Sequence, residues 1–152
     1  GALGVTVGIE DFDAREAPYS TLAQLHRFFD AVPALTCVFD TGNFIYSEED
    51  AVEAYEALRA HVAAAHLKDR SPVCLTRGDQ PIESIMGRKL YPAPVGGGCL
   101  PMMALLRAMR RDGYDGDLAI EHFGAVDQMN YMLASAQWLR AAWEIAGGEK
   151  TP

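Results

Sequence analysis

Four apolar runs of the chain alternate with stretches whose hydrophobic residues recur at helical spacing. The runs are rich in small or β-branched apolar residues and are bounded by turn residues; they cover residues 4–11, 35–43, 62–69 and 116–124. Runs of this length that are apolar on both faces are typical of strands buried in a parallel sheet. The pattern therefore predicts four parallel strands.

Helices are expected between and after these runs, over residues 20–31, 47–61, 100–111 and 126–146. Ser20 and Ser47 are the expected N-caps of the first two helices, because a serine hydroxyl accepts a bond from the first free backbone N–H groups. Gly147 and Gly148 are expected to end the last helix.

Residues 68–98 show no clear periodicity and hold several prolines and glycines, ending in the triplet at residues 96–98. A loop of about 30 residues inside a compact domain is usually a lid or a binding loop. We expect such a functional loop here, with a short hairpin inside it.

The order of elements is βαβαβ, the long loop, and then αβα. Alternation of this kind is typical of an α/β fold with a parallel sheet and right-handed crossovers. Residues 1–152 are expected to form one domain, since this length suffices for a single buried core.

Each run carries, where its apolar part ends, a side chain that can bind a metal: Glu10, Asp40, His66 and Glu121. In parallel α/β folds, the loops after the carboxyl ends of the strands build the active site. The four residues are therefore expected to converge at one edge of the sheet. Each residue taken alone could equally be a solvated loop charge, but together they favour a metal site because convergent carboxylates need a cation.

The overall charge narrows the choice of partners. The chain has 13 Lys and Arg against 21 Asp and Glu, for a net charge of -8. A surface this acidic repels phosphate backbones, so we expect neither nucleic acid nor an anionic membrane as a partner. No apolar run approaches the roughly 20 residues of a membrane span.

The three cysteines are odd in number, are widely spaced and form no CxxC, which favours the reducing cytoplasm.

Five segments carry a resemblance to a known family: GIEDF around Glu10, FDTGN around Asp40, AHLKD around His66, the YPAPVGGG loop, and GYDGDLAIEHFG around Glu121. With these segments in this order, the chain resembles the carboxyl-terminal half of the sugar phosphate isomerase/epimerase family, whose members are xylose isomerase-like TIM barrels. The resemblance implies a parallel (βα)4 half of a TIM barrel, corresponding to strands five to eight.

The same resemblance implies one divalent metal ion held by Glu10, Asp40, His66 and Glu121. Hard oxygen ligands with one imidazole suit Mn²⁺, Mg²⁺ or Co²⁺, with Zn²⁺ as the alternative. The implied reaction is isomerisation or epimerisation of a ketose or related sugar through a metal-stabilised enediolate. Glu10 and Glu121 would be the catalytic acid and base on opposite faces of the substrate.

Substrate contacts are implied at Asn43, Lys68, Asp69 and Arg70. Many sugar epimerases of the family have histidine where this chain has Asn43, which can bond a hydroxyl but carries no charge. Lys68 and Asp69 would orient the substrate or His66, or else form a surface ion pair. Arg70 is the nearest counterpart of an arginine that some members use.

Two further features have a plain interpretation beside a functional one. His122 follows Glu121 and should point to the opposite face of its strand, which favours a structural role. The triplet at residues 96–98 precedes a helix and could cradle a phosphate, although a turn is favoured because no Lys or Ser/Thr accompanies it.

Other functions stay open at this point. One is a related dehydratase of a cyclic polyol ketone, which begins with the same proton abstraction. Another is a non-catalytic half-barrel that binds or assembles. A zinc hydrolase of the endonuclease IV type is disfavoured, because it needs more histidines and the net charge of -8 opposes DNA.

Four βα units would leave two sheet edges unpaired and one face open. Three situations could cover them: a longer polypeptide with an amino-terminal half, a second polypeptide, or self-association. The first is favoured, because the sequence starts at Gly1 almost directly in a predicted strand.

Overall fold

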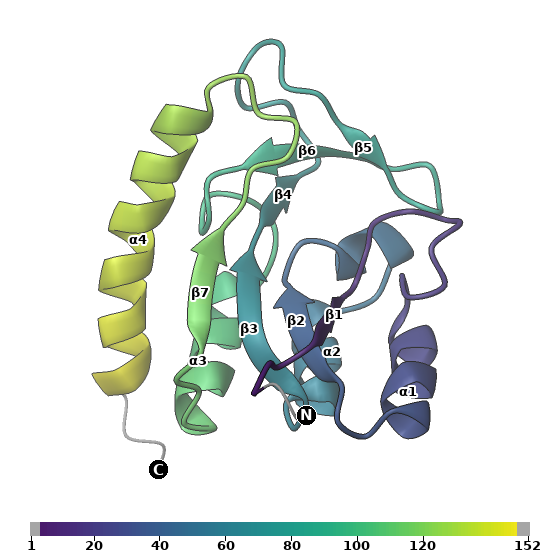
Figure 1. The fold of residues 1–152 in the computed structure, drawn as a ribbon. Coiled ribbons are helices and arrows are strands. Elements are labelled where there is room, and N and C mark those ends of the chain that lie inside the picture. Colours follow the sequence, from purple (N-terminus) through teal and green to yellow (C-terminus); the bar gives the residue numbers. More distant parts are fainter. Residues whose placement is uncertain (1–3, 149–152) are drawn as a thin grey trace.

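The chain folds around a four-stranded parallel sheet, as the computed structural model of residues 4–148 shows (Figure 1). The strands stand in the order β1-β2-β3-β7 and cover Gly8–Glu10, Thr36–Asp40, Val62–Leu67 and Asp117–Ile120. This confirms the α/β class and the four predicted strands. β1 is shorter than predicted, because residues 4–7 stay outside the strand and the side chains of Val5 and Val7 are exposed.

The register of the sheet brings the ends of the strands to one edge. Asp40 lies opposite His66, and Leu67 lies opposite Ile120, so that Glu121 follows directly. Because every pairing in this sheet is parallel, the carboxyl ends of all four strands meet at the same edge.

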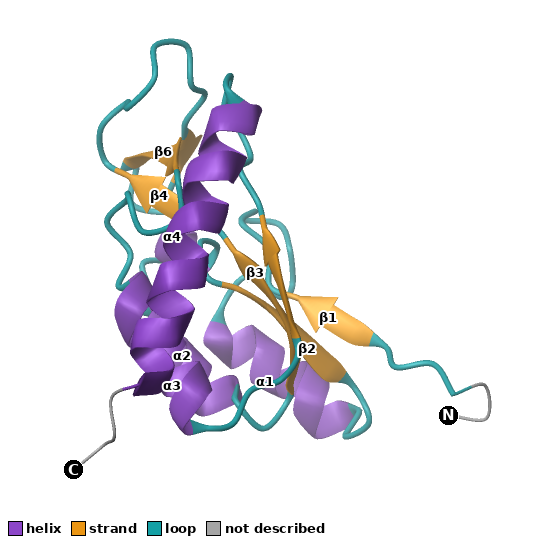
Figure 2. Ribbon diagram, turned by 90° about the vertical axis from the view of Figure 1, so that its left-hand side faces the viewer, coloured by secondary structure: helices purple, strands orange, loops and turns teal. Residues whose placement is uncertain are grey.

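Four α-helices lie on one side of the sheet, and no helix of the described residues covers the other side (Figure 2). They are α1 (Leu22–Ala31), α2 (Ala51–Leu58), α3 (Met102–Arg111) and α4 (Gln128–Gly148). The core forms where the apolar faces of sheet and helices meet; its completely buried members include Leu25, Cys37, Phe39, Leu58, Ala65, Leu67, Leu105 and Met109. Trp138 and Trp143 pack against it from α4.

The helix starts differ from the prediction. Thr21 caps α1 in a capping box with Gln24, and Asp50 caps α2 by accepting the N–H groups of Val52 and Glu53. Ser20 and Ser47 were the wrong caps, because the Ser47 hydroxyl donates to the Ser20 carbonyl and joins the two turns instead. Residues 44–47 form a short 3-10 helix before α2.

The end of α4 also differs from the prediction. The helix includes Gly147 and Gly148 instead of ending before them at residue 146, and Gly148 is the last described residue. Glycine lowers helix stability but still allows helical backbone angles, so a terminal pair can stay helical.

Residues 68–98 form a small antiparallel sheet beyond the carboxyl ends of the parallel strands (Figure 1). Its strands are β4 (Asp69–Ser71), β5 (Ile82–Glu83) and β6 (Lys89–Ala93), in the order β4-β6-β5. The expected hairpin is therefore confirmed. An ion pair between Arg88 and Glu48 fastens it to the segment that precedes α2.

Among residues 4–148, no helix is both long and apolar enough to cross a lipid bilayer.

Candidate metal centre

The structure brings the four strand-end residues together. Each of the residues Glu10, Asp40, His66 and Glu121 offers one ligand atom, and these four atoms lie within 4.8 Å of one another. The residues come from four different strand ends, spread over most of the sequence. Oxygen and nitrogen atoms this close together can all reach one ion, since metal–ligand distances are about 2.0–2.6 Å.

Short contacts link these side chains in pairs. His66 Nδ1 lies 2.9 Å from Glu10 Oε1 and 3.5 Å from Glu121 Oε2. Lys68 Nζ lies 2.8 Å from Asp40 Oδ2 and 3.1 Å from Glu121 Oε1. The Lys68 ammonium therefore offsets part of the negative charge of the three carboxylates.

Asp40 is the most deeply buried member of the cluster. Its Oδ1 accepts the N–H of Gly42, and its buried Oδ2 lies 2.8 Å from the Lys68 ammonium. Burial raises the pKa of Asp40 to about 7, against the lowering effect of Lys68. Burial alone would lower the pKa of Lys68, but Asp40 and Glu121 outweigh it and raise that pKa.

The donor set fits a divalent cation. Three carboxylates that converge repel one another unless cations compensate their charge, and the Lys68 ammonium balances only one of the three. Three carboxylates and one imidazole are the ligands that Mn²⁺, Mg²⁺, Co²⁺ or Zn²⁺ accept in proteins. Glu10, His66 and Glu121 each expose about a third of their side chains (36%, 31% and 38%), so a ligand can reach the cluster from solvent.

Asp11 is a site residue that the sequence analysis missed. It is buried, its Oδ1 accepts the backbone N–H of Asp40 at 2.9 Å, and its carbonyl accepts the side-chain amide of Asn43. Burial, and then the charge of Asp40, raise the pKa of Asp11 well above its usual range. The available signal was an acidic residue next to Glu10, at the end of the apolar run over residues 4–11.

Asn43 and Lys68, both expected to bind substrate, lie beside the cluster. The Asn43 amide donates to the Asp11 carbonyl at 2.7 Å, and its Oδ1 accepts from Lys68 Nζ at 2.9 Å. Asn43 is buried with both polar ends engaged, so it holds the ammonium of Lys68 in place. Of these two residues, Lys68 has its charged end at the cluster.

Asp69 points away from the cluster, into the glycine triplet. Its two carboxylate oxygens accept the backbone N–H groups of Arg70, Gly96, Gly98 and Leu100 at 2.8–3.2 Å. The triplet therefore does cradle an anion, but that anion is a carboxylate of this chain. These contacts occupy the carboxylate of Asp69, which the resemblance had implied as a substrate contact.

Arg70 also has its contacts inside the protein. The side chain is fully buried, its Nη2 lies 3.1 Å from Asp13 Oδ2, and its Nη1 donates to the Phe123 carbonyl. Burial lowers the pKa of Arg70, and Asp13 counteracts that effect. Arg70 therefore links the loops that follow the two glutamates.

His122 has the structural position predicted for it. It is buried, its Nε2 lies 3.0 Å from Ser135 Oγ, and its ring meets Tyr131 edge to face. Burial lowers the pKa of His122, which favours a neutral ring.

Gly42 offers a test of how tightly the cluster is packed. A Cβ atom there would lie 2.7 Å from both the backbone oxygen and Cγ of Lys68. We expect Gly42→Ala to lower the free energy of unfolding by about 1–3 kcal/mol and to weaken metal binding, because Lys68 and Asp40 must shift. Urea denaturation and calorimetric metal titration measure these effects. Gly148→Ala, where no atom lies within 4 Å, should change neither.

Comparison with known sequences and structures shows which proteins this chain is similar to. The sequence profile described as xylose isomerase-like TIM barrel matches residues 1–142. No curated protein matches the chain in sequence.

Several solved structures share the fold. A xylose isomerase domain protein from Planctomyces limnophilus is 21% identical with a TM-score of 0.70, over 96% of this chain and 48% of that one. A 3-keto-D-glucoside 4-epimerase from E. coli is 22% identical with a TM-score of 0.65, over 92% and 47%. A probable 3-DHS dehydratase from Bacillus anthracis is 18% identical with a TM-score of 0.66, over 87% and 48%. The chain thus spans about half the length of the structures it matches.

Proposed function

The chain belongs to the xylose isomerase-like TIM barrel family, and from this premise we propose that it is a divalent-metal-dependent isomerase or epimerase of a ketose or related sugar. The observation that carries the proposal is the convergence of four metal-competent side chains within 4.8 Å, at the carboxyl ends of four parallel strands. In this fold class, that edge is where active sites form.

Glu10, Asp40, His66 and Glu121 would hold the ion, proposed to be Mn²⁺, Mg²⁺ or Co²⁺, with Zn²⁺ as the alternative. A bound divalent ion polarises a substrate carbonyl and makes the neighbouring C–H bond more acidic. Proton transfer and substrate binding are then carried out by side chains of this chain.

The two glutamates are placed to move a proton. Glu10 ends β1 and Glu121 follows β7, so they approach the cluster from the two outer strands of the sheet. One carboxylate removes the proton from the carbon next to the carbonyl, and the other returns a proton from the opposite side, which inverts that carbon. Which glutamate acts first depends on the stereochemistry of the substrate.

Lys68 is the proposed substrate contact. Its ammonium lies between Asp40 and Glu121 and is fixed by Asn43. It can donate to a substrate oxygen and stabilise negative charge that develops there, because a fixed donor needs no reorganisation during the reaction.

The cellular setting proposed for this activity is the cytoplasm. The three cysteines are free, and Cys74 and Cys99 are exposed. Exposed thiols favour a reducing compartment.

Metal binding is the first test. We expect the chain to bind Mn²⁺ in isothermal titration calorimetry, and we expect Asp40→Asn and His66→Ala each to weaken binding at least about tenfold, because each removes a ligand. His26→Ala, a histidine on α1, is the matched control and should bind like the unmodified chain. Equal affinity in all four proteins would refute the proposed centre.

The reaction is tested by solvent exchange. Candidate ketoses in D₂O should take up deuterium next to the carbonyl when the chain and Mn²⁺ are both present, and much more slowly without Mn²⁺. Binding of Mn²⁺ without exchange in any ketose would favour the non-catalytic alternative.

A further inference from the structure

We propose that Arg70 is a positioning residue: it holds the loop after Glu10 and the loop after Glu121 at a fixed separation, so that both carboxylates face one substrate carbon. The inference rests on the proposed function, because it concerns the two glutamates that transfer the proton. It differs from the role that the resemblance implied, in which Arg70 would contact the substrate.

Arg70 stands in one row with two residues of the site. β3 ends at Leu67 and β4 begins at Asp69, so one residue, Lys68, separates the two strands. Side chains alternate between the two faces of extended backbone. Leu67 lies in the core and Asp69 in the glycine triplet. His66 and Lys68 lie at the cluster instead. The alternation therefore places Arg70 on the side of His66 and Lys68.

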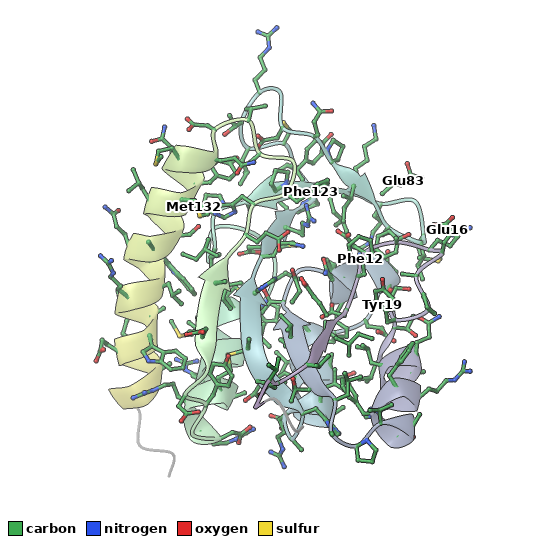
Figure 3. The ribbon with its side chains drawn as sticks, in the orientation of Figure 1. Phe12, Glu16, Tyr19, Glu83, Phe123 and Met132 are labelled. Atoms are coloured by element: carbon green, nitrogen blue, oxygen red, sulfur yellow. The ribbon has the colours of Figure 1, made fainter. Side chains whose placement is uncertain are left out.

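The guanidinium of Arg70 joins the two loops directly. Its Nη2 lies 3.1 Å from Asp13 Oδ2, and its Nη1 donates to the Phe123 carbonyl at 3.2 Å. Asp13 lies three positions after Glu10, and Phe123 lies two positions after Glu121. Figure 3 labels Phe123 on the second of these loops. One side chain therefore contacts the backbone or side chain of both loops, close to each glutamate.

A guanidinium suits this bridge better than an ammonium. Its donors are fixed in one plane, so two terminal nitrogens reach two acceptors in a set geometry, whereas an ammonium is a point charge on a flexible stem. Arg70 is also completely buried, so close packing restricts its side chain. A single rigid group thus sets the distance between two segments that lie 53 and 57 positions away from it in the sequence.

A contribution to stability alone does not explain this arrangement. Burying a guanidinium costs hydration energy, and the attraction to a carboxylate often does not repay that cost. Burial lowers the pKa of Arg70, whereas the charges of Asp13, Asp40 and Glu121 raise it. The guanidinium therefore lies within electrostatic reach of two members of the cluster. Its position is better explained by the loops that it holds than by the stability that it adds.

Each loop also has an anchor of its own. Asp11 Oδ1 accepts the backbone N–H of Asp40, and the Gly124 carbonyl accepts the N–H of Gln80. These bonds tie each loop to its own neighbour, whereas Arg70 ties the two loops to each other. Proton transfer needs a carboxylate within hydrogen-bond reach of the reacting carbon. A displacement of about 1 Å can cost about 10²-fold in rate, so loss of the bridge should slow the reaction.

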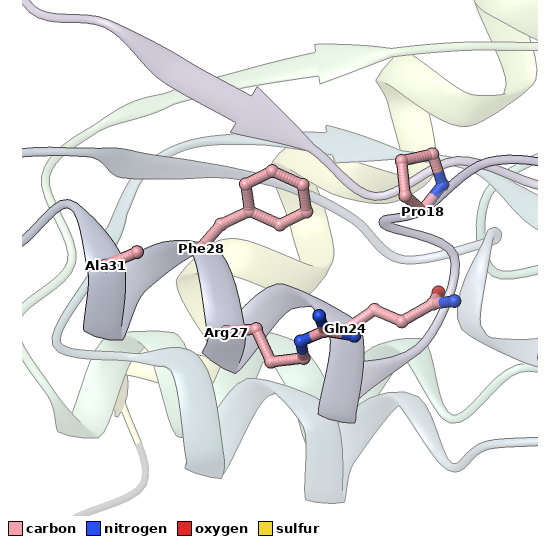
Figure 4. Close-up of a pocket in the computed structure, with 5 residues that line it drawn as sticks. All are labelled: Pro18, Gln24, Arg27, Phe28 and Ala31. Atoms are coloured by element: carbon pink, nitrogen blue, oxygen red, sulfur yellow. The ribbon is translucent and has the colours of Figure 1, made fainter.

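Arg70→Lys tests the bridge, because it keeps the charge but cannot hold both acceptors in one fixed geometry. At saturating Mn²⁺, we expect kcat for deuterium exchange to fall about 10–100-fold, with KM for the ketose within about threefold of the unmodified chain. Arg27→Lys is the matched control and should react like the unmodified chain. Arg27 is exposed on α1, where it lines a pocket with Pro18 and Phe28 (Figure 4).

Two readouts do not require catalysis. In metal-free Arg70→Lys, the amides of Ala17 and Glu121, which are hydrogen-bonded at the two loops, should exchange with solvent at least about tenfold faster, while those of β2 stay protected. Calorimetry should show Mn²⁺ affinity weakened at least about tenfold although the charge is kept. Asp13→Ala should reproduce both changes, and the double variant should add little, because both substitutions break one bridge.

Circular dichroism verifies that each variant folds, and Asp13→Ala carries the test if Arg70→Lys does not. An Arg70→Lys variant with the kcat, Mn²⁺ affinity and amide protection of the unmodified chain overturns the proposal. A raised KM at unchanged kcat also overturns it, since Arg70 would then contact the substrate. If the unmodified chain binds Mn²⁺ but exchanges no ketose, the proposed reaction fails, and amide exchange and Mn²⁺ affinity in the two variants still decide the positioning role.

Discussion

Replacing Glu10 or Glu121 by glutamine is expected to slow metal-dependent deuterium exchange into the substrate by about 10²–10⁴-fold, the contribution that a positioned acid or base makes. Glutamine keeps the size and one oxygen of the side chain but cannot accept the proton. Both residues are needed if each serves one face of the substrate, so each single substitution should suppress inversion of the carbon.

The design must separate proton transfer from metal binding, because both glutamates are also proposed ligands. Exchange rates are therefore compared at Mn²⁺ concentrations that saturate each variant, as determined by calorimetry. Glu16→Gln is the matched control, since Glu16 is exposed on the loop after β1 (Figure 3). Full exchange in either Glu10→Gln or Glu121→Gln would contradict the role given to that residue.

Replacing Asp69 by alanine is expected to lower the free energy of unfolding by about 3–5 kcal/mol. The carboxylate accepts four backbone N–H groups, from Arg70, Gly96, Gly98 and Leu100. A buried donor left unpaired costs about 1–3 kcal/mol; the Arg70 N–H belongs to a buried residue, whereas Gly96 and Gly98 are exposed, and water that reaches them reduces the sum. The loop also leads into α3, so loss of the Asp69 carboxylate would also destabilise the start of that helix.

Urea denaturation followed by circular dichroism measures this effect. Asp69→Asn should lose less stability than Asp69→Ala, because one oxygen can still accept from the loop. Asp30→Ala, at an exposed position of α1, is the control and should stay within about 0.5 kcal/mol of the unmodified chain. A change below 1 kcal/mol in Asp69→Ala, on the same order as a surface substitution, would show that the loop does not depend on the carboxylate.

The strand ends were predictable because their signal is local. An apolar run that stops at an acid or a histidine marks both a buried strand and the residue at its end, and β3 (Val62–Leu67) lies within the run predicted over residues 62–69. Helix starts were predicted less well. Serine, threonine and aspartate all cap helices, so the choice of Thr21 over Ser20 depends on which hydroxyl the folded chain leaves facing the helix.

The sequence alone determined the α/β class, the four strands and the four residues that meet at the candidate metal centre. These features follow from the spacing of hydrophobic residues and from which residue ends each strand, and both can be read from a few neighbouring positions. Only the tertiary structure decided what Asp11, Asp69 and Arg70 do. Asp69 lies 29 positions from Gly98, and Arg70 lies 57 from Asp13. Backbone N–H groups carry no residue signature, so a buried carboxylate that binds them cannot be distinguished in the sequence from one that faces a ligand.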